Sequence, residues 1–239
     1  LGAPVHIGFR PPDGSGEWTG PDWSAADGLH ERERWCLPLS HAGIRADPHD
    51  FALARPPRST PDAPVLVHPG ARYGAKRWPA TRFAQVAAAL DRPDRPVLIT
   101  GSATEHPLAA EVAARAGLGA DRVLAGRTSL GELADLTAQA ALVISGDTGI
   151  AHVASAFSTP SVVLFGPVAP HRWGPPADGP HIALHHPKLC RGEPFADDPD
   201  PALLAIDVAE VLDAAALALH RTTPFNTVIT PERRATTTP

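Results

Sequence analysis

Residues 141–152 read Ala-Leu-Val-Ile-Ser-Gly-Asp-Thr-Gly-Ile-Ala-His, and this stretch decides the fold class. The apolar run over 141–145 predicts a strand that is buried on both faces. A short polar turn then leads directly into a predicted helix over 148–157. A buried strand, a glycine-containing turn and a helix in immediate succession are typical of sheets whose parallel strands are joined by helices.

The same alternation continues on both sides of this segment. Further strands are predicted over 65–67, 96–100, 121–124 and 161–165. Further helices are predicted over 81–90, 105–116 and 130–140, with a last long helix over 201–220. The pattern predicts an α/β domain with helices on both faces of a parallel sheet. Ligands of such domains bind beyond the carboxyl ends of the strands.

The first sixty residues are less regular. A short strand is predicted over 5–9 and a helix over 29–42, and four prolines mark residues 55–64 as a linker. The tail over 221–239 is rich in Thr and Pro, and disorder is predicted there.

Composition excludes several classes of protein. The net charge of -5, without a cluster of Lys and Arg, argues against a nucleic-acid partner. The sequence has no run of eighteen apolar residues, so no membrane span is predicted. The first residues lack the charged, apolar and small-residue zones of a secretory signal. Cys36 and Cys190 are expected to be free thiols rather than a disulfide. The chain contains no methionine, even at position 1, so an N-terminally truncated fragment is expected.

The loop over 68–79 lies between a predicted strand and a predicted helix. Gly70 and Gly74 let backbone amides approach a ligand closely, and Lys76 and Arg77 add positive charge. This chemistry suits a diphosphate, although a flexible basic loop without a ligand explains the same residues.

The turn over 146–149 offers a second anion site. Asp147 is predicted as the N-cap of the following helix, whose first amides are unpaired donors near the positive end of the helix dipole. His152 falls one turn further along and is within reach of the same ligand. Asp147 as a helix cap without a further role remains the alternative.

Glu105 follows another strand, where a carboxylate can accept hydrogen bonds from a ribose, or serve only as a first-turn helix acid. Asp198-Pro-Asp200 has the form of a metal-binding motif, but it is interpreted as a solvated turn because no strand precedes it. The histidines at 181, 185 and 186 lie near Cys190 without the spacing of a zinc site.

Taken together, Pro-Gly-Ala over 69–71, Lys-Arg-Trp-Pro over 76–79, Asp-Thr-Gly over 147–149 with His152, and Phe-Gly-Pro over 165–167 resemble the ADP-heptose:lipopolysaccharide heptosyltransferases, glycosyltransferase family 9. The resemblance covers residues 61–220 strongly and residues 1–60 more weakly. It implies the GT-B architecture, in which two Rossmann-like domains face each other across a cleft. Residues 1–60 would then end the acceptor-binding domain, 61–200 would form the donor-binding domain, and the helix over 201–220 would cross back toward the first.

The resemblance also implies the roles of individual residues. Lys76 would stabilise the departing ADP, Glu105 would bind the ribose, Thr128 would lie at the adenine edge, and Asp147 would meet phosphate and donor sugar. The full set implied for the donor site is Gly70, Ala71, Arg72, Lys76, Glu105, Thr128, Asp147, Thr148, Gly149 and His152. Ala71 and Arg72 replace threonines of some members, which puts those hydroxyl contacts in doubt.

The implied reaction transfers a heptose-like sugar from an ADP-sugar to a lipopolysaccharide core or related glycan, with inversion and without a metal or cofactor. The general base would lie in the missing N-terminal segment, so negligible turnover is expected of this chain alone. A cytoplasmic monomer, at most peripheral at the inner face of the membrane, is expected. A nucleotide-sugar epimerase of the same architecture and a non-catalytic nucleotide-binding remnant are the alternatives.

Overall fold

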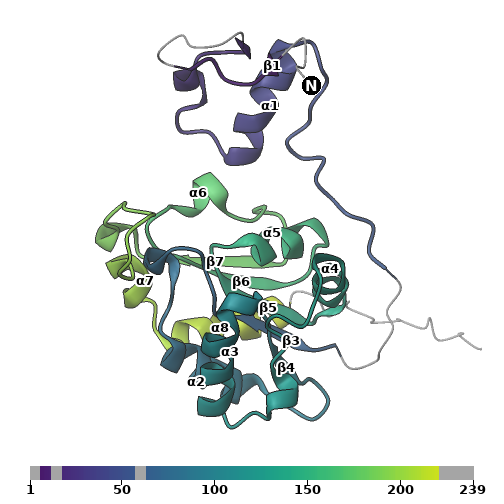
Figure 1. Cartoon of the computed structure of the whole chain (residues 1–239), viewed down its shortest axis with the longest axis vertical. Coiled ribbons are helices and arrows are strands. Elements are labelled where there is room, and N and C mark those ends of the chain that lie inside the picture. The colour runs from purple at the N-terminus through teal and green to yellow at the C-terminus, as the bar shows by residue number, and fades with distance from the viewer. Residues whose placement is uncertain (1–5, 12–17, 57–62, 221–239) are drawn as a thin grey trace, which may run out of the picture.

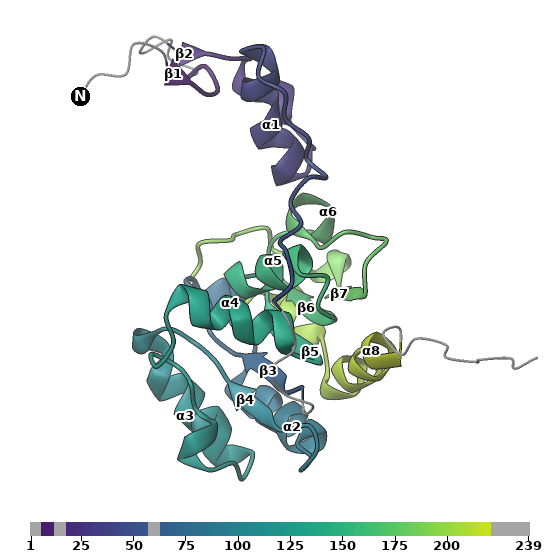
Figure 2. The ribbon, with the colours of Figure 1, turned by 90° about the vertical axis from the view of Figure 1, so that its right-hand side faces the viewer.

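A computed structural model describes residues 6–11, 18–56 and 63–220 of the chain. Within these ranges a small N-terminal unit lies above a larger α/β unit, and an extended segment connects the two (Figures 1 and 2). No helix in the described ranges is long and apolar enough to cross a bilayer.

The larger unit is built on a five-stranded parallel sheet with the strand order β4-β3-β5-β6-β7. Its strands are β3 (Val65–His68), β4 (Val97–Ile99), β5 (Leu142–Gly146), β6 (Ser161–Phe165) and β7 (His181–His185). The α/β class with a parallel sheet, as predicted, is confirmed. The chain moves outward from β3 to β4 and then returns to the other side of β3 with β5, so the switch point of the topology lies between β3 and β5.

The helices cover both faces of this sheet, because successive side chains of a strand point to opposite sides. On β3, Val65 and Val67 face the larger core, where α2 (Ala80–Leu90), α3 (His106–Arg115) and α8 (Val208–His220) pack. Leu66 faces the smaller core, which is covered by α4 (Leu130–Gln139) and α5 (Gly149–Ala156). Every residue of β3 and β5 is buried. Because both faces of these strands are covered by helices, their sequences are continuous apolar runs.

The N-terminal unit contains the short parallel pair β1 (His6–Ile7) and β2 (Trp18–Thr19) and the helix α1 (Glu31–His41), close to its predicted bounds. Within this unit, Phe9 after β1, Trp23 in the 3-10 helix Trp23–Ala26 and Trp35 on α1 form edge-to-face ring contacts. Direct bonds tie this unit and its connection to the larger one, and one of them runs from Arg55 Nη2 to the Thr159 hydroxyl oxygen over 3.0 Å. His30 Nε2 lies 3.0 Å from the Gly174 carbonyl oxygen, and the Leu53 amide donates to the Ala156 carbonyl over 2.9 Å.

Three predictions about elements were wrong. The strand over 121–124 is instead a 3-10 helix (Ala120–Arg122) followed by one isolated bridge between Val123 and Ile99. The sequence analysis did not predict the edge strand β7. Most of its residues are only partly buried, so its sequence lacks the continuous apolar run of a central strand.

The long helix over 201–220 is two helices, α7 (Pro201–Ala205) and α8, which are separated at Ile206 and Asp207. Ile206 is completely buried, and its carbonyl accepts hydrogen bonds from Trp78 and Arg82. Asp207 and Glu210 exchange side-chain-to-amide bonds that start α8. α8 packs mainly on α2 and on strands β5 to β7. The prediction that the helix over 201–220 crosses back toward the N-terminal unit stays a prediction.

Cys36 and Cys190 are free, as expected. Residues 57–62 of the predicted linker and the predicted disordered tail over 221–239 lie outside the described residues.

Candidate functional site

The loops that the sequence singled out meet at the carboxyl edge of the sheet, around the switch point. The basic loop over 69–79 leaves β3, and the turn over 147–149 leaves the neighbouring strand β5. Crevices at such switch points are the usual ligand sites of open parallel sheets, because the connecting helices diverge to opposite faces there.

An ion pair joins the two loops. Lys76 ends the short 3-10 helix Gly74–Lys76, and its Nζ lies 2.6 Å from Oδ2 of Asp147. The Lys76 side chain is 20% exposed and that of Asp147 only 6%. A partly accessible ammonium group at this edge can exchange its carboxylate partner for another anion, which is the chemistry that a phosphate site requires.

Asp147 is not the N-cap of α5, contrary to the prediction. The cap position belongs to Thr148, which is extended and makes no side-chain capping bond. The helix begins at Gly149, where an added Cβ would meet no atom within 4 Å. The start of α5 is therefore open to a ligand, and the carboxylate of Asp147 is directed to Lys76 instead of to the first-turn amides.

The basic loop is held in place by its own side chains, which argues against a flexible loop. Arg77 donates from Nε to the Ala71 carbonyl over 2.8 Å and more weakly from Nη2 to the Arg72 carbonyl over 3.4 Å. Gly70 is buried and Arg72 is exposed. Arg72 and Arg77 are exposed and Lys76 is partly exposed, and the bonds of Arg77 also support the backbone of the loop.

The segment over 196–200 braces the same loop from outside. The Ala75 amide donates to the Ala196 carbonyl over 2.9 Å, and the Ala75 carbonyl accepts from the Asp200 amide over 3.1 Å. Asp200 is completely buried, and its carboxylate binds the amides of Arg191 and Ala202. Asp200 is therefore a structural cap of α7. The prediction that Asp198-Pro-Asp200 is a solvated turn is wrong for Asp200.

Glu105 lies beside Gly70, where an added Cβ would approach its Oε1 to 2.1 Å. Burial raises the pKa of Glu105, but hydrogen bonds from the Ser102 amide and hydroxyl and the nearby charges of His68 and Arg77 outweigh burial and lower it. The carboxylate is thus ionised and already serves as a capping group of the 3-10 helix Ala103–Glu105. Both readings of Glu105, the helix acid and the ribose ligand, remain compatible with this position.

Thr128 ends the neighbouring loop, just before the Ser129 capping box that starts α4. This loop contacts the Glu105 loop through the Gly126 amide, which donates to the Gly101 carbonyl over 2.9 Å. Thr128 therefore belongs to the same edge of the sheet, next to the loop that carries Glu105.

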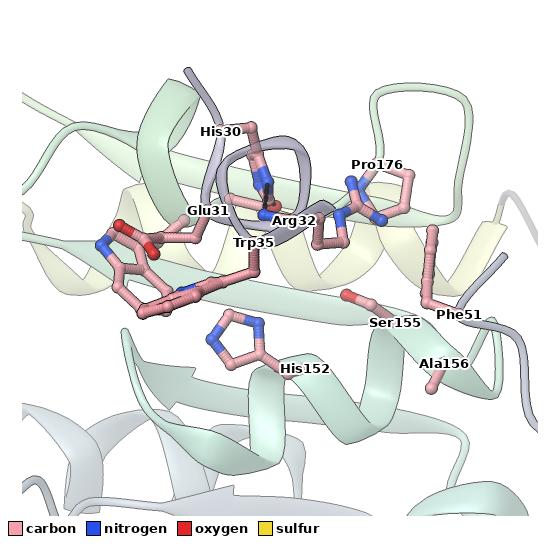
Figure 3. Close-up of a pocket in the computed structure, with 11 residues that line it drawn as sticks. His30, Glu31, Arg32, Trp35, Phe51, His152, Ser155, Ala156 and Pro176 are labelled. Atoms are coloured by element: carbon pink, nitrogen blue, oxygen red, sulfur yellow. Dashed lines mark hydrogen bonds between the residues drawn. The ribbon is translucent and has the colours of Figure 1, made fainter. Parts of the chain in front are cut away.

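His152 faces a different space, a cavity of about 400 Å³ between the two units (Figure 3). The ring remains accessible through this cavity, although protein atoms displace much of its surrounding water. That desolvation lowers the pKa of His152; the charge of Asp147 opposes the shift, and the charges of His30, Arg32 and Lys76 add to it. The imidazole is therefore neutral at pH 7.

The cavity wall opposite His152 comes from α1, from the end of α6 (Pro170–Trp173) and from the residues that follow it. His30, Arg32, Trp35 and Trp173 belong to this wall, and sequence reasoning did not assign them to a site. The sequence gives little indication that these residues lie together, because α1 and α5 are more than one hundred residues apart and share no motif.

Comparisons with known proteins agree with this geometry. The model of glycosyltransferase family 9 (heptosyltransferase) matches residues 30–191. The chain is 36% identical over 131 residues to lipooligosaccharide heptosyltransferase 2 of Haemophilus influenzae, covering 52% of this chain and 36% of the relative. It is 37% identical over 106 residues to lipopolysaccharide heptosyltransferase 2 of Escherichia coli, covering 43% and 30%. The matches span about a third of the length of these curated relatives.

Two solved structures share the fold. A family 9 glycosyltransferase of Veillonella parvula superposes with a TM-score of 0.71 at 22% identity, covering 92% of this chain and 68% of the other. ADP-heptose lipopolysaccharide heptosyltransferase II of E. coli gives 0.68 at 23% identity, covering 91% and 70%. These likenesses confirm the expected GT-B fold class. The family model matches more than half of the chain, so this chain belongs to glycosyltransferase family 9, the heptosyltransferases.

Proposed function

We propose that this chain carries the donor site of a glycosyltransferase that moves a heptose-like sugar from an ADP-sugar to a lipopolysaccharide core or a related glycan. The observation that supports this most directly is the Lys76–Asp147 pair at the switch point, beside the open start of α5. Related folds support the choice of nucleotide. An E. coli heptosyltransferase, WaaC, has been solved with ADP, and the heptosyltransferase TibC with ADP-D-beta-D-heptose.

In the proposed complex, the diphosphate displaces Asp147 from Lys76. Lys76, the first-turn amides of α5 and the accessible Arg72 then bind the phosphate oxygens, while Glu105 accepts hydrogen bonds from the ribose and the loop of Thr128 borders the adenine. Asp147, once released, is free to accept hydrogen bonds from hydroxyls of the donor sugar. Gly70 and Ala71 provide close backbone approach, as Thr148 and Gly149 do on the opposite side.

The transfer step is an inverting displacement. An acceptor hydroxyl, deprotonated by a carboxylate, attacks the anomeric carbon. The bond from that carbon to the phosphate oxygen breaks, and its electron pair leaves with ADP. Lys76 and the α5 amides stabilise the charge that develops on ADP, so the proposal requires no metal. The loss of one such preorganised donor typically costs about 2.7–4 kcal/mol of transition-state stabilisation. A cytoplasmic monomer at the inner membrane face completes the proposal.

Calorimetric titration of the chain with ADP, UDP and GDP tests the donor site. We expect saturable binding of ADP and weaker binding of the other two nucleotides. Lys76→Ala should weaken ADP binding by about tenfold or more, because it removes a charge-assisted bond of about 1.5–3 kcal/mol. Asp147→Asn should leave ADP affinity unchanged or increase it, because Lys76 no longer has to exchange partners.

Arg115→Ala is the matched control, since it removes a cation from an exposed ion pair on α3, away from the loops of the site. A folded Lys76→Ala variant that binds ADP as tightly as the unchanged chain would contradict the assignment of Lys76.

A further inference from the structure

A row of polar side chains crosses three neighbouring strands directly beneath the loops of the proposed donor site. Leu66 on β3 and Val143 on β5 face the smaller core, and side chains two residues further along a strand point to the same side. His68 and Ser145 therefore share that side, and they are direct partners in the ladder between β3 and β5. Thr100 follows β4 and joins the row, because its hydroxyl oxygen lies 3.0 Å from Nδ1 of His68. The sheet thus changes from apolar to polar one step before these loops begin.

The contact with Thr100 determines which nitrogen of His68 carries the proton. Thr100 is 1% exposed, and within the described ranges its hydroxyl has no partner other than Nδ1 of His68. A buried hydroxyl that only accepted this bond would leave its own proton unpaired, which is costly in a protein interior. The hydroxyl therefore donates to Nδ1, and the neutral imidazole carries its proton on Nε2.

Nε2 of His68 is an unpaired donor that is open to the outside. It has no hydrogen-bond partner among the residues that the structure describes. It is not sealed from solvent either, because the sealed and unpaired side-chain nitrogens of these residues are Nε of Arg34 and Nε of Arg95. The ring is otherwise enclosed, since His68 is only 8% exposed. One N–H donor therefore reaches the surface at the carboxyl edge of the sheet.

The carboxylate of Glu105 supplies an acceptor close to this donor. Burial lowers the pKa of His68, and the charge of Glu105 opposes that shift, so the two groups lie near enough to interact. They form no ion pair within the described ranges, and the carboxylate is instead held over Gly70, two residues after His68. A donor and an acceptor that lie close together without contact are complementary to a hydroxyl group, which accepts one hydrogen bond while it donates another.

We propose that His68 is a ribose-binding residue of the donor site, and that its Nε2–H donates to a ribose hydroxyl oxygen of the nucleotide while Glu105 accepts the proton of the same hydroxyl. This inference rests on the proposed function, because it adds a second ribose contact to the site of the ADP-sugar. Thr100 is a positioning residue, since it keeps the proton of His68 on Nε2 and touches no ligand itself. His68 is thereby a specificity-determining residue that favours a ribonucleotide over its deoxy analogues.

Calorimetric titration with ADP, 2′-deoxy-ADP and 3′-deoxy-ADP tests this contact. For the unchanged chain, we expect at least one deoxy nucleotide to bind about tenfold or more weakly than ADP, because the hydroxyl that links His68 and Glu105 is missing. Equal binding of all three nucleotides would overturn the inference.

Two variants of His68 separate a ribose contact from a role in packing. His68→Asn keeps a polar atom near the position of Nδ1 and removes Nε2. It should weaken ADP binding by about tenfold, equivalent to 1.4 kcal/mol, and leave the affinity for the weaker deoxy nucleotide nearly unchanged. His68→Gln, whose longer side chain can return an N–H donor toward the position of Nε2, should recover part of the preference for ADP. Loss of ADP and deoxy-nucleotide binding by the same factor in His68→Asn would show a role in packing alone and overturn the inference.

Ser145→Ala is the matched control, because it changes the same row of side chains and leaves the bond between His68 and Thr100 in place. Ser145 is completely buried and its hydroxyl is unpaired, so the substitution removes no hydrogen bond. ADP affinity and the preference for ADP should remain those of the unchanged chain. A loss of preference as large as that of His68→Asn would contradict the assignment to His68.

Imidazole ¹⁵N signals of the unchanged chain decide the question if both His68 variants unfold. Thr100→Ser identifies the His68 signals, because it alters the residue next to Nδ1 and keeps the hydroxyl that donates to it. We expect the pattern of a neutral ring protonated on Nε2, and a shift of the Nε2 signal at saturation with ADP that the weaker deoxy nucleotide does not produce. An Nε2 signal that bound ADP leaves unmoved would overturn the inference.

ADP binding by the unchanged chain separates this inference from the proposed function. Saturable ADP binding that a folded His68→Asn variant retains in full rejects the ribose contact alone and leaves the donor site intact. Absence of ADP binding by the folded, unchanged chain rejects the donor site, and the ribose contact with it.

Discussion

Replacing Lys76 with alanine should destabilise the fold more than replacing Asp147, although both changes break the same 2.6 Å ion pair. Lys76→Ala leaves the carboxylate of Asp147, which is only 6% exposed, without its counter-charge. Asp147→Ala leaves an ammonium group on a flexible stem that is already 20% exposed and can turn toward water. The asymmetry therefore follows from which charge remains buried.

The size of the effect is set by burial. Removal of one partner from a fully buried pair costs about 3–5 kcal/mol, which is an upper limit here because water can reach the space vacated by Lys76. The neighbouring first-turn amides of α5 also offset part of the cost, by about 0.3–1 kcal/mol. We expect about 2–3 kcal/mol for Lys76→Ala and about 1 kcal/mol for Asp147→Ala.

Urea unfolding of the two single variants and the double variant measures these values and their coupling. The matched control is the pair formed by Glu111 and Arg115, which has a similar N–O distance of 2.8 Å but side chains 46% and 53% exposed. Its coupling should be about 0.3–0.5 kcal/mol. Equal coupling energies for the two pairs, or a larger loss for Asp147→Ala than for Lys76→Ala, would refute the argument from burial.

Two further predictions concern packing and pH. Gly74→Ala should lower the free energy of unfolding by about 1–3 kcal/mol in urea titrations, because the new Cβ would lie 1.5 Å from the Asp197 carbonyl oxygen. Gly131→Ala, in α4 with no atom within 4 Å, should instead raise it by about 0.5–1 kcal/mol, and a loss of stability there would contradict the helix. Burial lowers the pKa of His181 to about 4, below its unfolded value near 6.5, so the unfolded chain binds more protons between these pH values. Stability should therefore fall as pH drops from 6.5 to 4, by about 3 kcal/mol from this residue, and His181→Gln should remove most of that slope in unfolding measured across this range.

The sequence by itself determined the class of the fold and the loops that could carry chemistry. Strands buried on both faces and helices with one apolar face are local patterns, so each can be recognised from a few neighbouring residues. Helices α2 and α4 and strands β3, β5 and β6 lie within one or two residues of their predicted bounds. The glycines and charged residues around Lys76 and Asp147 marked the site because they follow those strands directly.

Tertiary structure decided what each of these residues contacts. Asp147 looked like a helix cap, but the pairing of β3 beside β5 brings Lys76 to its carboxylate across 71 residues of chain. The break at Ile206 depends likewise on Trp78 and Arg82, which bind its carbonyl from a distant segment. No local pattern encodes these partners, because a side chain's hydrogen-bond choice depends on which segments burial has brought within 3 Å of it.

The cavity between the two units was decided in the same way. Arg32 and Trp35 on α1 and His152 on α5 each fit an ordinary amphipathic helix in the sequence. They line one cavity because direct bonds dock the two units against each other, among them those of His30 to Gly174, of Leu53 to Ala156 and of Arg55 to Thr159. The spacing of apolar residues along a helix indicates which side of it is buried. Which segment packs against the other side depends on long-range packing alone.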